Sequence, residues 1–159
     1  MTTVLFPGSF DPFHNGHLEV VERAGQLFGE VVVACLRKPQ KAEALFSSEE
    51  RVDMITEAVA HLANVQIVSV SKLVVEVAHE VEASAIVRGL RAISDFENEL
   101  QMAQMNRQLS GVETLFIPTS SRTSFLSSRL LREVASYGGD VSAFVPKSVA
   151  KRLQEKFGR

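Results

Sequence analysis

The sequence predicts an α/β fold in which a five-stranded parallel sheet carries helices on both faces. Two observations lead to this prediction. Short apolar segments alternate five times with amphipathic stretches that keep helical spacing, and the joints between them are short. This alternation is typical of parallel sheets whose connecting helices cover both faces. Polar residues suited to chemistry also gather directly after the apolar segments, at the sheet edge where ligands bind in such folds.

Length and composition indicate one domain of ordinary globular type. The chain has 159 residues, so we expect a single Rossmann-like domain over residues 1–159. Hydrophobic residues make up 45% and charged residues 23%. The net charge of −2, from 17 basic and 19 acidic residues, excludes a protein that coats nucleic acid through a basic surface. Cys35 is the single cysteine and fits a reducing compartment. The sequence shows neither a signal peptide nor a membrane-spanning stretch, so we expect a cytoplasmic protein with no membrane or nucleic-acid partner.

Each predicted element follows from its own pattern. Uninterrupted apolar residues indicate strands that are covered on both faces, and apolar residues recurring every three or four positions indicate helices. Ser47 and Glu50 form a capping box at one helix start. Pro146 suits another start, because a first turn does not use the amide that proline lacks. In chain order we expect a strand at 4–6, a helix at 17–28, a strand at 31–36, a helix from 47 to about 62, a strand at 65–70, a helix at 73–81, a strand at 85–87, a helix at 96–109, a strand at 114–117, a helix at 127–136 and a last helix from 146.

The segment 7–17, PGSFDPFHNGH, is the strongest candidate for chemistry. Gly8 and Gly16 permit unusual backbone conformations and a close approach of a ligand. We expect the helix that begins near His17 to direct free amides and its positive dipole end at a phosphate. An imidazole from His14 or His17 would stabilise charge on phosphoryl oxygens. A histidine before a helix is also commonly a cap or a solvated residue, and a zinc site would need a third ligand that this segment lacks.

The residues 14–17, HNGH, resemble the (T/H)xGH signature of the nucleotidylyltransferase superfamily. The longer string PGSFDPxxxGH is similar to bacterial phosphopantetheine adenylyltransferases, and the resemblance extends over nearly the whole chain. Further motifs follow in the same order. They are Pro39-Gln40-Lys41, Phe46, Glu49-Glu50-Arg51, RGLRA at 88–92, Asp95-Phe96-Glu97, Glu99-Leu100-Gln101, Met105-Asn106-Arg107 and SFLSS at 124–128, which is similar to the family's nucleotide-binding motif (S/F)xSS(S/T).

The resemblance implies an enzyme of coenzyme A biosynthesis that transfers the adenylyl group of ATP to 4′-phosphopantetheine, giving dephospho-coenzyme A and pyrophosphate. Direct in-line attack by the acceptor phosphate needs positioning and charge stabilisation but no covalent nucleophile. The resemblance further implies Mg²⁺ held mainly through the ATP phosphates, no metal site built from side chains, a homohexamer, and feedback inhibition by coenzyme A.

The same resemblance assigns roles to individual residues. His17, Lys41 and Arg91 are implied to be catalytic. The acceptor is implied to contact Ser9, Lys41, Val74 and Arg88, and Arg88 can grip a phosphate with two donors. ATP is implied to contact Ser9, Phe10, His17, Gly89, Leu90, Arg91, Glu99, Thr123, Ser124, Phe125, Leu126, Ser127, Ser128 and Arg129. From the residues alone, Lys41 is ordinarily a solvated charge and Glu99 a helix-surface partner for Arg91 or Arg107. Ser127 and Ser128 suit phosphate binding, since hydroxyls and amides at a helix start both donate.

Three positions depart from the commonest family pattern: His14 replaces Thr, Thr123 replaces an aromatic residue, and Arg129 replaces a small Ser or Thr. Two alternative functions therefore stay open. One is a related nucleotidylyltransferase with another phosphate acceptor, such as nicotinamide mononucleotide. The other is a nucleotide-binding regulator without catalysis. A class I aminoacyl-tRNA synthetase is disfavoured, because the chain has no KMSKS-like motif and no room for a tRNA-binding region.

Overall fold

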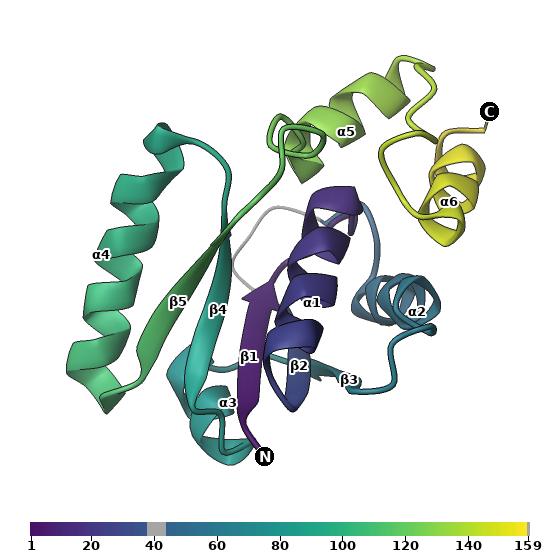
Figure 1. Ribbon diagram of the computed structural model, residues 1–159. Coiled ribbons are helices and arrows are strands. Elements are labelled where there is room, and N and C mark those ends of the chain that lie inside the picture. Colours follow the sequence, from purple (N-terminus) through teal and green to yellow (C-terminus); the bar gives the residue numbers. More distant parts are fainter. Residues whose placement is uncertain (38–43, 159) are drawn as a thin grey trace.

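The computed structural model describes residues 1–37 and 44–158. Its centre is a parallel sheet of five strands in the order β3-β2-β1-β4-β5 (Figure 1). Every neighbouring pair in this sheet is parallel, which confirms the predicted fold class. The strands are β1 (Thr3–Gly8), β2 (Glu30–Leu36), β3 (Val65–Val70), β4 (Ala85–Leu90) and β5 (Glu113–Pro118).

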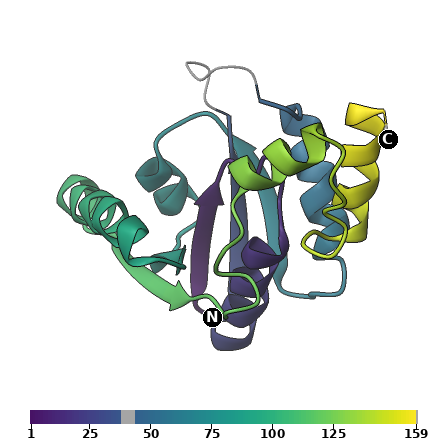
Figure 2. The ribbon, with the colours of Figure 1, turned by 90° about the horizontal axis from the view of Figure 1, so that it is seen from above.

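Helices lie on both faces of the sheet (Figure 2). The first face carries α1, α2, α5 and α6, and the second carries α3 and α4. Within the described part of the chain, no helix is both long enough and apolar enough to cross a bilayer. The helices are α1 (Asn15–Leu27), α2 (Ser48–Ala58), α3 (Val74–Glu80), α4 (Ile93–Ser110), α5 (Ser128–Ser136) and α6 (Lys147–Phe157).

The uninterrupted apolar character of the strands follows from their having a core on each side. In β1, Val4 and Phe6 pack into the core under α1 and α2, while Leu5 faces the core under α3. In β2, Val33 likewise packs into the core under α1 and α2, and Ala34 faces the core under α3. Successive side chains of a strand point to opposite faces, so a sheet covered on both sides needs apolar residues at every position.

Two strands, β1 and β4, continue by two or more residues past their predicted carboxyl ends. Pro7 and Gly8 still belong to β1, and residues 88–90 continue β4 because they pair with residues 116–118 of β5. Arg88 therefore projects from the last residues of a strand, rather than from the loop after it. Two helices also begin two or more residues before their predicted starts, α1 at Asn15 and α4 at Ile93.

The sheet order reverses at β1, whose neighbours are β2 on one side and β4 on the other. At the carboxyl ends of β1 and β4, the loops that follow them separate toward opposite faces, which leaves room for a ligand. The segment 7–17 and the segment 88–92 both lie at this point. The sequence prediction that chemistry gathers after the strands is consistent with this topology.

Candidate active site

Two cavities open at the carboxyl edge of the sheet. The first cavity has a volume of about 390 Å³ and lies among the loop after β1, the start of α1, the end of β4 and the segment before α5. The second cavity, of about 960 Å³, lies between α3 and α4. Pro7, Arg88, Asn98 and Glu99 line both, so the two cavities share one wall. The predicted residues that line the first cavity are Ser9, Phe10, His17, Arg88, Gly89, Arg91, Glu99, Thr123, Leu126, Ser127 and Ser128.

His14 and His17 are locked together at the start of α1. The backbone amide of Gly16 donates to His14 Nδ1 at 3.0 Å, and the backbone amide of His14 donates to His17 Nδ1 at 3.1 Å. The two rings stack with their centroids 3.7 Å apart. Because each Nδ1 accepts a hydrogen bond, each neutral ring carries its proton on Nε2. His17 thus has a defined tautomer and lines the first cavity.

Both imidazoles are held in the neutral form. Burial, with a smaller effect of the Arg91 charge, lowers the pKa of His14 to about 3. Burial also lowers the pKa of His17 well below its ordinary value, and His14, Arg88 and Arg91 add to the shift. At neutral pH, His17 is therefore an uncharged imidazole beside two arginines. It can donate a hydrogen bond from its N–H group, but it does not act as a general acid.

The start of α1 corrects two expectations. Neither Gly8 nor Gly16 has a positive φ, so conformational freedom does not explain them. They provide space, since a Cβ on Gly16 would lie 2.8 Å from His14 Cε1. The free amides expected here are also partly used, because the amide of Asn15 donates to the carbonyl of Phe144 and that of Gly16 to His14.

Phe10 lines the first cavity with a buried ring and an unusual backbone conformation. Its ring is buried among Phe6, Phe13 and His17, with the Phe10 and His17 ring centroids 4.9 Å apart. Its φ of 52° lies in the left-handed region, which is uncommon for a residue with a side chain. A backbone held in such a conformation beside a cavity is typical of a functional site.

Arg88 and Glu99 form an ion pair on the wall that the two cavities share. Arg88 Nε lies 3.0 Å from Glu99 Oε2, and Nη2 lies 2.9 Å from Oε1. Arg88 Nη1 also donates to the carbonyl of Pro7. The expectation that Glu99 pairs with Arg91 or Arg107 is wrong. The packing of α4 beside β4 places the Glu99 carboxylate against the Arg88 guanidinium instead. Arg107 pairs instead with Glu113 at 3.1 Å.

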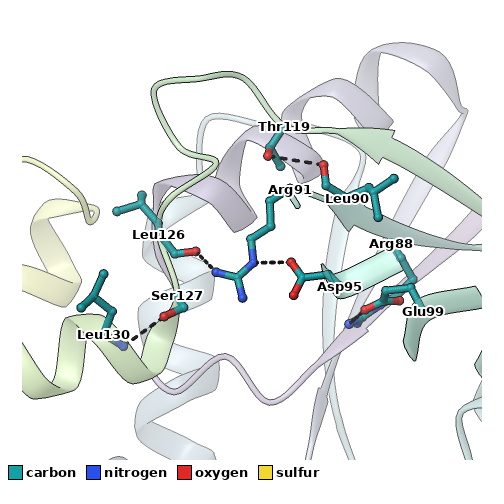
Figure 3. Close-up of polar contacts among 9 residues, drawn as sticks. All are labelled: Arg88, Leu90, Arg91, Asp95, Glu99, Thr119, Leu126, Ser127 and Leu130. Carbon is teal, nitrogen blue, oxygen red and sulfur yellow. Dashed lines mark hydrogen bonds and ion pairs between the residues drawn. The ribbon is translucent and has the colours of Figure 1, made fainter. Parts of the chain in front are cut away.

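Arg91 connects β4 to the segment before α5. Its Nε lies 2.9 Å from Asp95 Oδ2, and its Nη1 donates to the carbonyl of Leu126 (Figure 3). The carbonyl of Leu90 accepts from the amide of Thr119 at 3.0 Å, which joins the same two segments. The guanidinium of Arg91 thus lies at the cavity wall with its orientation fixed from both sides.

The two serines at the start of α5 have structural partners. The side chain of Ser127 caps α5 by accepting from the amide of Leu130 at 3.0 Å (Figure 3). Ser128 Oγ donates to the carbonyl of Pro12 at 2.8 Å. The Ser128 hydroxyl hydrogen is therefore used to join α5 to the loop after β1. This corrects the expectation that it is free to donate to a phosphate.

The remaining predicted residues lie elsewhere. Val74 lines the second cavity. Leu90, Ser124, Phe125 and Arg129 line neither cavity, and the ring of Phe125 packs edge-on against Phe144 with centroids 5.7 Å apart. Lys41 lies outside the described residues.

Two buried charged residues with no predicted role, Asp11 and Arg51, hold the backbone of the loops beside the site. The carboxylate of Asp11 accepts from the amides of Leu45 and Phe46 at 2.8 and 2.9 Å. Arg51 donates to the carbonyl of Ser9 at 2.7 Å and to that of Leu36 at 3.0 Å. Both residues occur within motifs already noted in the sequence. For Asp11, a charge between the apolar residues Phe10 and Pro12 was the available signal, and for Arg51 the local sequence offered none.

The carboxylates near the cavities are engaged by the protein. Within residues 1–37 and 44–158, no group of three or more His, Cys, Asp or Glu side chains is placed to hold a metal ion. Glu99 and Asp95 on the first cavity wall each pair with an arginine. Arginines, backbone amides and a neutral imidazole N–H are donors, so the first cavity suits an anion with several phosphate groups.

The chain belongs to the cytidylyltransferase-like family, whose profile matches residues 5–134. The parallel α/β sheet, with an HxGH turn and a donor-lined cavity at its switch point, is consistent with this class of protein. The relatives narrow this class. A phosphopantetheine adenylyltransferase of Heliobacterium modesticaldum is 52% identical over 159 residues, which cover 99% of this chain and 94% of the relative. Proteins of the same name from Gloeobacter violaceus and Streptomyces coelicolor are 52% and 51% identical, over 96% and 98% of this chain and 95% and 98% of their own lengths. These relatives confirm the resemblance seen in the sequence.

Proposed function

We propose that this protein is a phosphopantetheine adenylyltransferase, which transfers AMP from ATP to 4′-phosphopantetheine and releases dephospho-coenzyme A and pyrophosphate. The observation that carries the proposal is the wall common to the two cavities. Arg88 and Glu99 lie on that wall, and His17 lines the first cavity. A reaction that joins two substrates needs two pockets that meet where the bond forms.

ATP would occupy the first cavity. The guanidinium of Arg91, together with the backbone at the start of α5, provides donors for the phosphates. The Nε2–H of His17 would donate to an oxygen of the α-phosphate. That oxygen gains negative charge in the transition state, so a fixed neutral donor stabilises the transition state more than the ground state.

The acceptor would occupy the second cavity with its phosphate toward Arg88. Leu73, Val74, Ile86 and Met102 give this cavity an apolar wall. Thr114 lines it as well, and within the described part of the chain its buried hydroxyl has no hydrogen-bond partner. A long, flexible arm with methyl and amide groups matches such a wall better than the compact ribose and ring of nicotinamide mononucleotide.

The chemistry follows from this placement. An oxygen of the acceptor phosphate forms a bond to the α-phosphorus, and the bond from that phosphorus to the bridging oxygen of pyrophosphate breaks with its electron pair. The acceptor phosphate is already ionised at neutral pH, so no side chain has to remove a proton. Mg²⁺ held by the ATP phosphates and water would neutralise charge on the leaving pyrophosphate. Lys41 is proposed to hold the acceptor phosphate together with Arg88.

We further propose a homohexamer, cytoplasmic location and feedback inhibition by coenzyme A. Self-association would cover the apolar surface that α4 and β5 leave exposed, formed by Ile93, Met105, Leu109 and Leu115. Coenzyme A contains both the acceptor arm and an adenine nucleotide, so it would bind across both cavities. The buried thiol of Cys35 suits a reducing compartment.

A pyrophosphate-release assay tests the proposal. The purified protein is given ATP and Mg²⁺ with 4′-phosphopantetheine, with nicotinamide mononucleotide, or with no acceptor. We expect pyrophosphate release only when phosphopantetheine is the acceptor. We expect that release to stop when EDTA removes the metal. Release with the mononucleotide would transfer the proposal to the first alternative. ATP binding without release under any condition would favour the regulator.

A further inference from the structure

We propose that Glu19 is a positioning residue that holds the nucleotide loop, residues 119–127, in the geometry that binds ATP. This inference rests on the proposed function, because it assigns ATP to the first cavity. The nucleotide loop joins β5 to α5 and contributes Thr119, Thr123, Leu126 and Ser127 to the wall of that cavity. Glu19 is not part of the wall, so it acts through the loop.

The contacts of Glu19 use both oxygens of its carboxylate. Oε1 accepts from the amide of Ser120 at 2.8 Å, and Oε2 accepts from the hydroxyl of Ser120 at 3.1 Å. The hydroxyl of Thr123 also donates to Oε2. Three donors from one loop therefore converge on one side chain of α1. Burial alone would raise the pKa of Glu19, but the hydrogen bonds from Thr123 and Ser120 outweigh it and lower that pKa.

Arg23 extends this contact by one turn of α1. Its Nη1 donates to the carbonyl of Pro118, the last residue of β5, and lies 3.6 Å from Glu19 Oε1. Two side chains of one helix thus hold the end of β5 and the first half of the nucleotide loop that follows it. The loop's end is held by Arg91 through the carbonyl of Leu126.

The position of Glu19 gives these contacts a functional consequence. Glu19 follows His17 by two residues on the same rigid helix. His17 would contact the α-phosphate, while the nucleotide loop would contact the rest of ATP. Fixing the loop to α1 sets the distance between these two sets of contacts before ATP arrives, and a site ordered in advance loses less conformational entropy on binding.

The test compares Glu19→Gln with the matched control Glu22→Gln on the same helix. Glu22 pairs with His61 at 3.0 Å on the surface and does not touch the nucleotide loop. Glutamine keeps one acceptor oxygen but loses the charge and the second acceptor. We expect Glu19→Gln to raise the KM for ATP roughly tenfold and to leave the KM for phosphopantetheine within about twofold. We expect Glu22→Gln to change neither.

Hydrogen exchange supplies a readout that does not depend on turnover. In the protein without ligand, we expect Glu19→Gln to speed exchange of the amides of residues 119–126 and to leave the β1 amides unchanged. Unchanged exchange in the nucleotide loop, or equal rises in both KM values, would overturn the role of Glu19. If the wild-type protein bound ATP without turnover, the proposed function would fail. The dissociation constant for ATP and the exchange rates would still decide whether Glu19 positions the loop.

Discussion

Arg88 and Glu99 face each other across β4 and α4 in a two-pronged ion pair, with N–O distances of 3.0 and 2.9 Å. The pair lies on the wall common to both cavities, and Arg88 is also tied to the carbonyl of Pro7. Three of the five N–H donors of Arg88 are therefore occupied, and the guanidinium plane is fixed. The two remaining donors would be available to an acceptor phosphate. Glu99 thus orients Arg88 and limits how many hydrogen bonds a phosphate can gain from it.

Replacement of Arg88 should affect the acceptor more than ATP. We expect Arg88→Ala to raise the Kd for 4′-phosphopantetheine at least tenfold, because a charge-assisted contact to its phosphate is lost. We expect the Kd for ATP to change less than about threefold, as measured by calorimetry. Arg107→Ala is the matched control, since Arg107 pairs with Glu113 on the surface. Equal loss of affinity for both substrates would contradict the assignment of Arg88.

His17 should act on the rate rather than on binding. We expect His17→Ala to lower kcat by about 10²–10³ and to change KM little, because its donor is most useful when charge develops on the α-phosphate. His17→Gln retains an N–H donor and should recover part of the rate. His61→Ala serves as the control, since His61 lies on the surface beside Glu22. A kcat that His17→Ala leaves unchanged would remove His17 from the mechanism.

The depressed pKa of His14 predicts how stability depends on pH. The unfolded chain takes up the His14 proton near the ordinary pKa of 6.5, whereas the folded protein takes it up only near a pKa of about 3. Between these values the unfolded state binds more protons, so the free energy of unfolding falls as the pH falls below 6.5. Each such histidine contributes a slope that approaches roughly 1.4 kcal/mol per pH unit.

Urea unfolding between pH 5 and 6.5 checks this dependence. We expect His14→Thr to reduce the slope of the unfolding free energy by roughly 1 kcal/mol per pH unit. Threonine can replace His14 as the cap of α1, so the stability at pH 7.5 should stay within about 1 kcal/mol. The same slope in both proteins would show that His14 takes up a proton in the folded state as easily as in the unfolded chain.

Asp11 should contribute to stability through the two amides that it accepts. Asp11→Ala leaves the amides of Leu45 and Phe46 without their acceptor, and that of Phe46 is buried. We expect a loss of roughly 2–4 kcal/mol in the free energy of unfolding, and Asp11→Asn should lose about half as much. Asp53→Ala, at an exposed position on α2, is the control. A loss below about 0.5 kcal/mol for Asp11→Ala would show that these hydrogen bonds add nothing net.

The capping box of α2 gives a simpler stability prediction. The hydroxyl of Ser47 accepts from the amide of Glu50 at 3.1 Å, and the carboxylate of Glu50 accepts from the amide of Ser47 at 3.1 Å. We expect Ser47→Ala to lower the free energy of unfolding by about 1 kcal/mol. Ser47→Asp, which restores a capping oxygen, should recover most of this loss in the same denaturant titration. Failure of aspartate to recover it would place the effect elsewhere.

The sequence alone determined the parallel sheet, the order of its strands and helices along the chain, and the capping box of α2. Each of these is a local pattern. A continuous apolar segment such as 31–36 can be buried on both sides, and a capping box is complete within four residues. The motif at 14–17 also predicted a histidine directly after the first strand, and His17 lines the first cavity because the turn and the helix that carry it are contiguous.

Only the tertiary structure decided which charged and polar groups meet. Glu99 pairs with Arg88 rather than with Arg91 or Arg107, and Glu19 reaches Thr123 across 104 positions of the chain. Such contacts depend on strand ends and helix docking to within about 1 Å, because a hydrogen bond weakens steeply with distance and angle. Spacing along the chain does not specify distances of that kind.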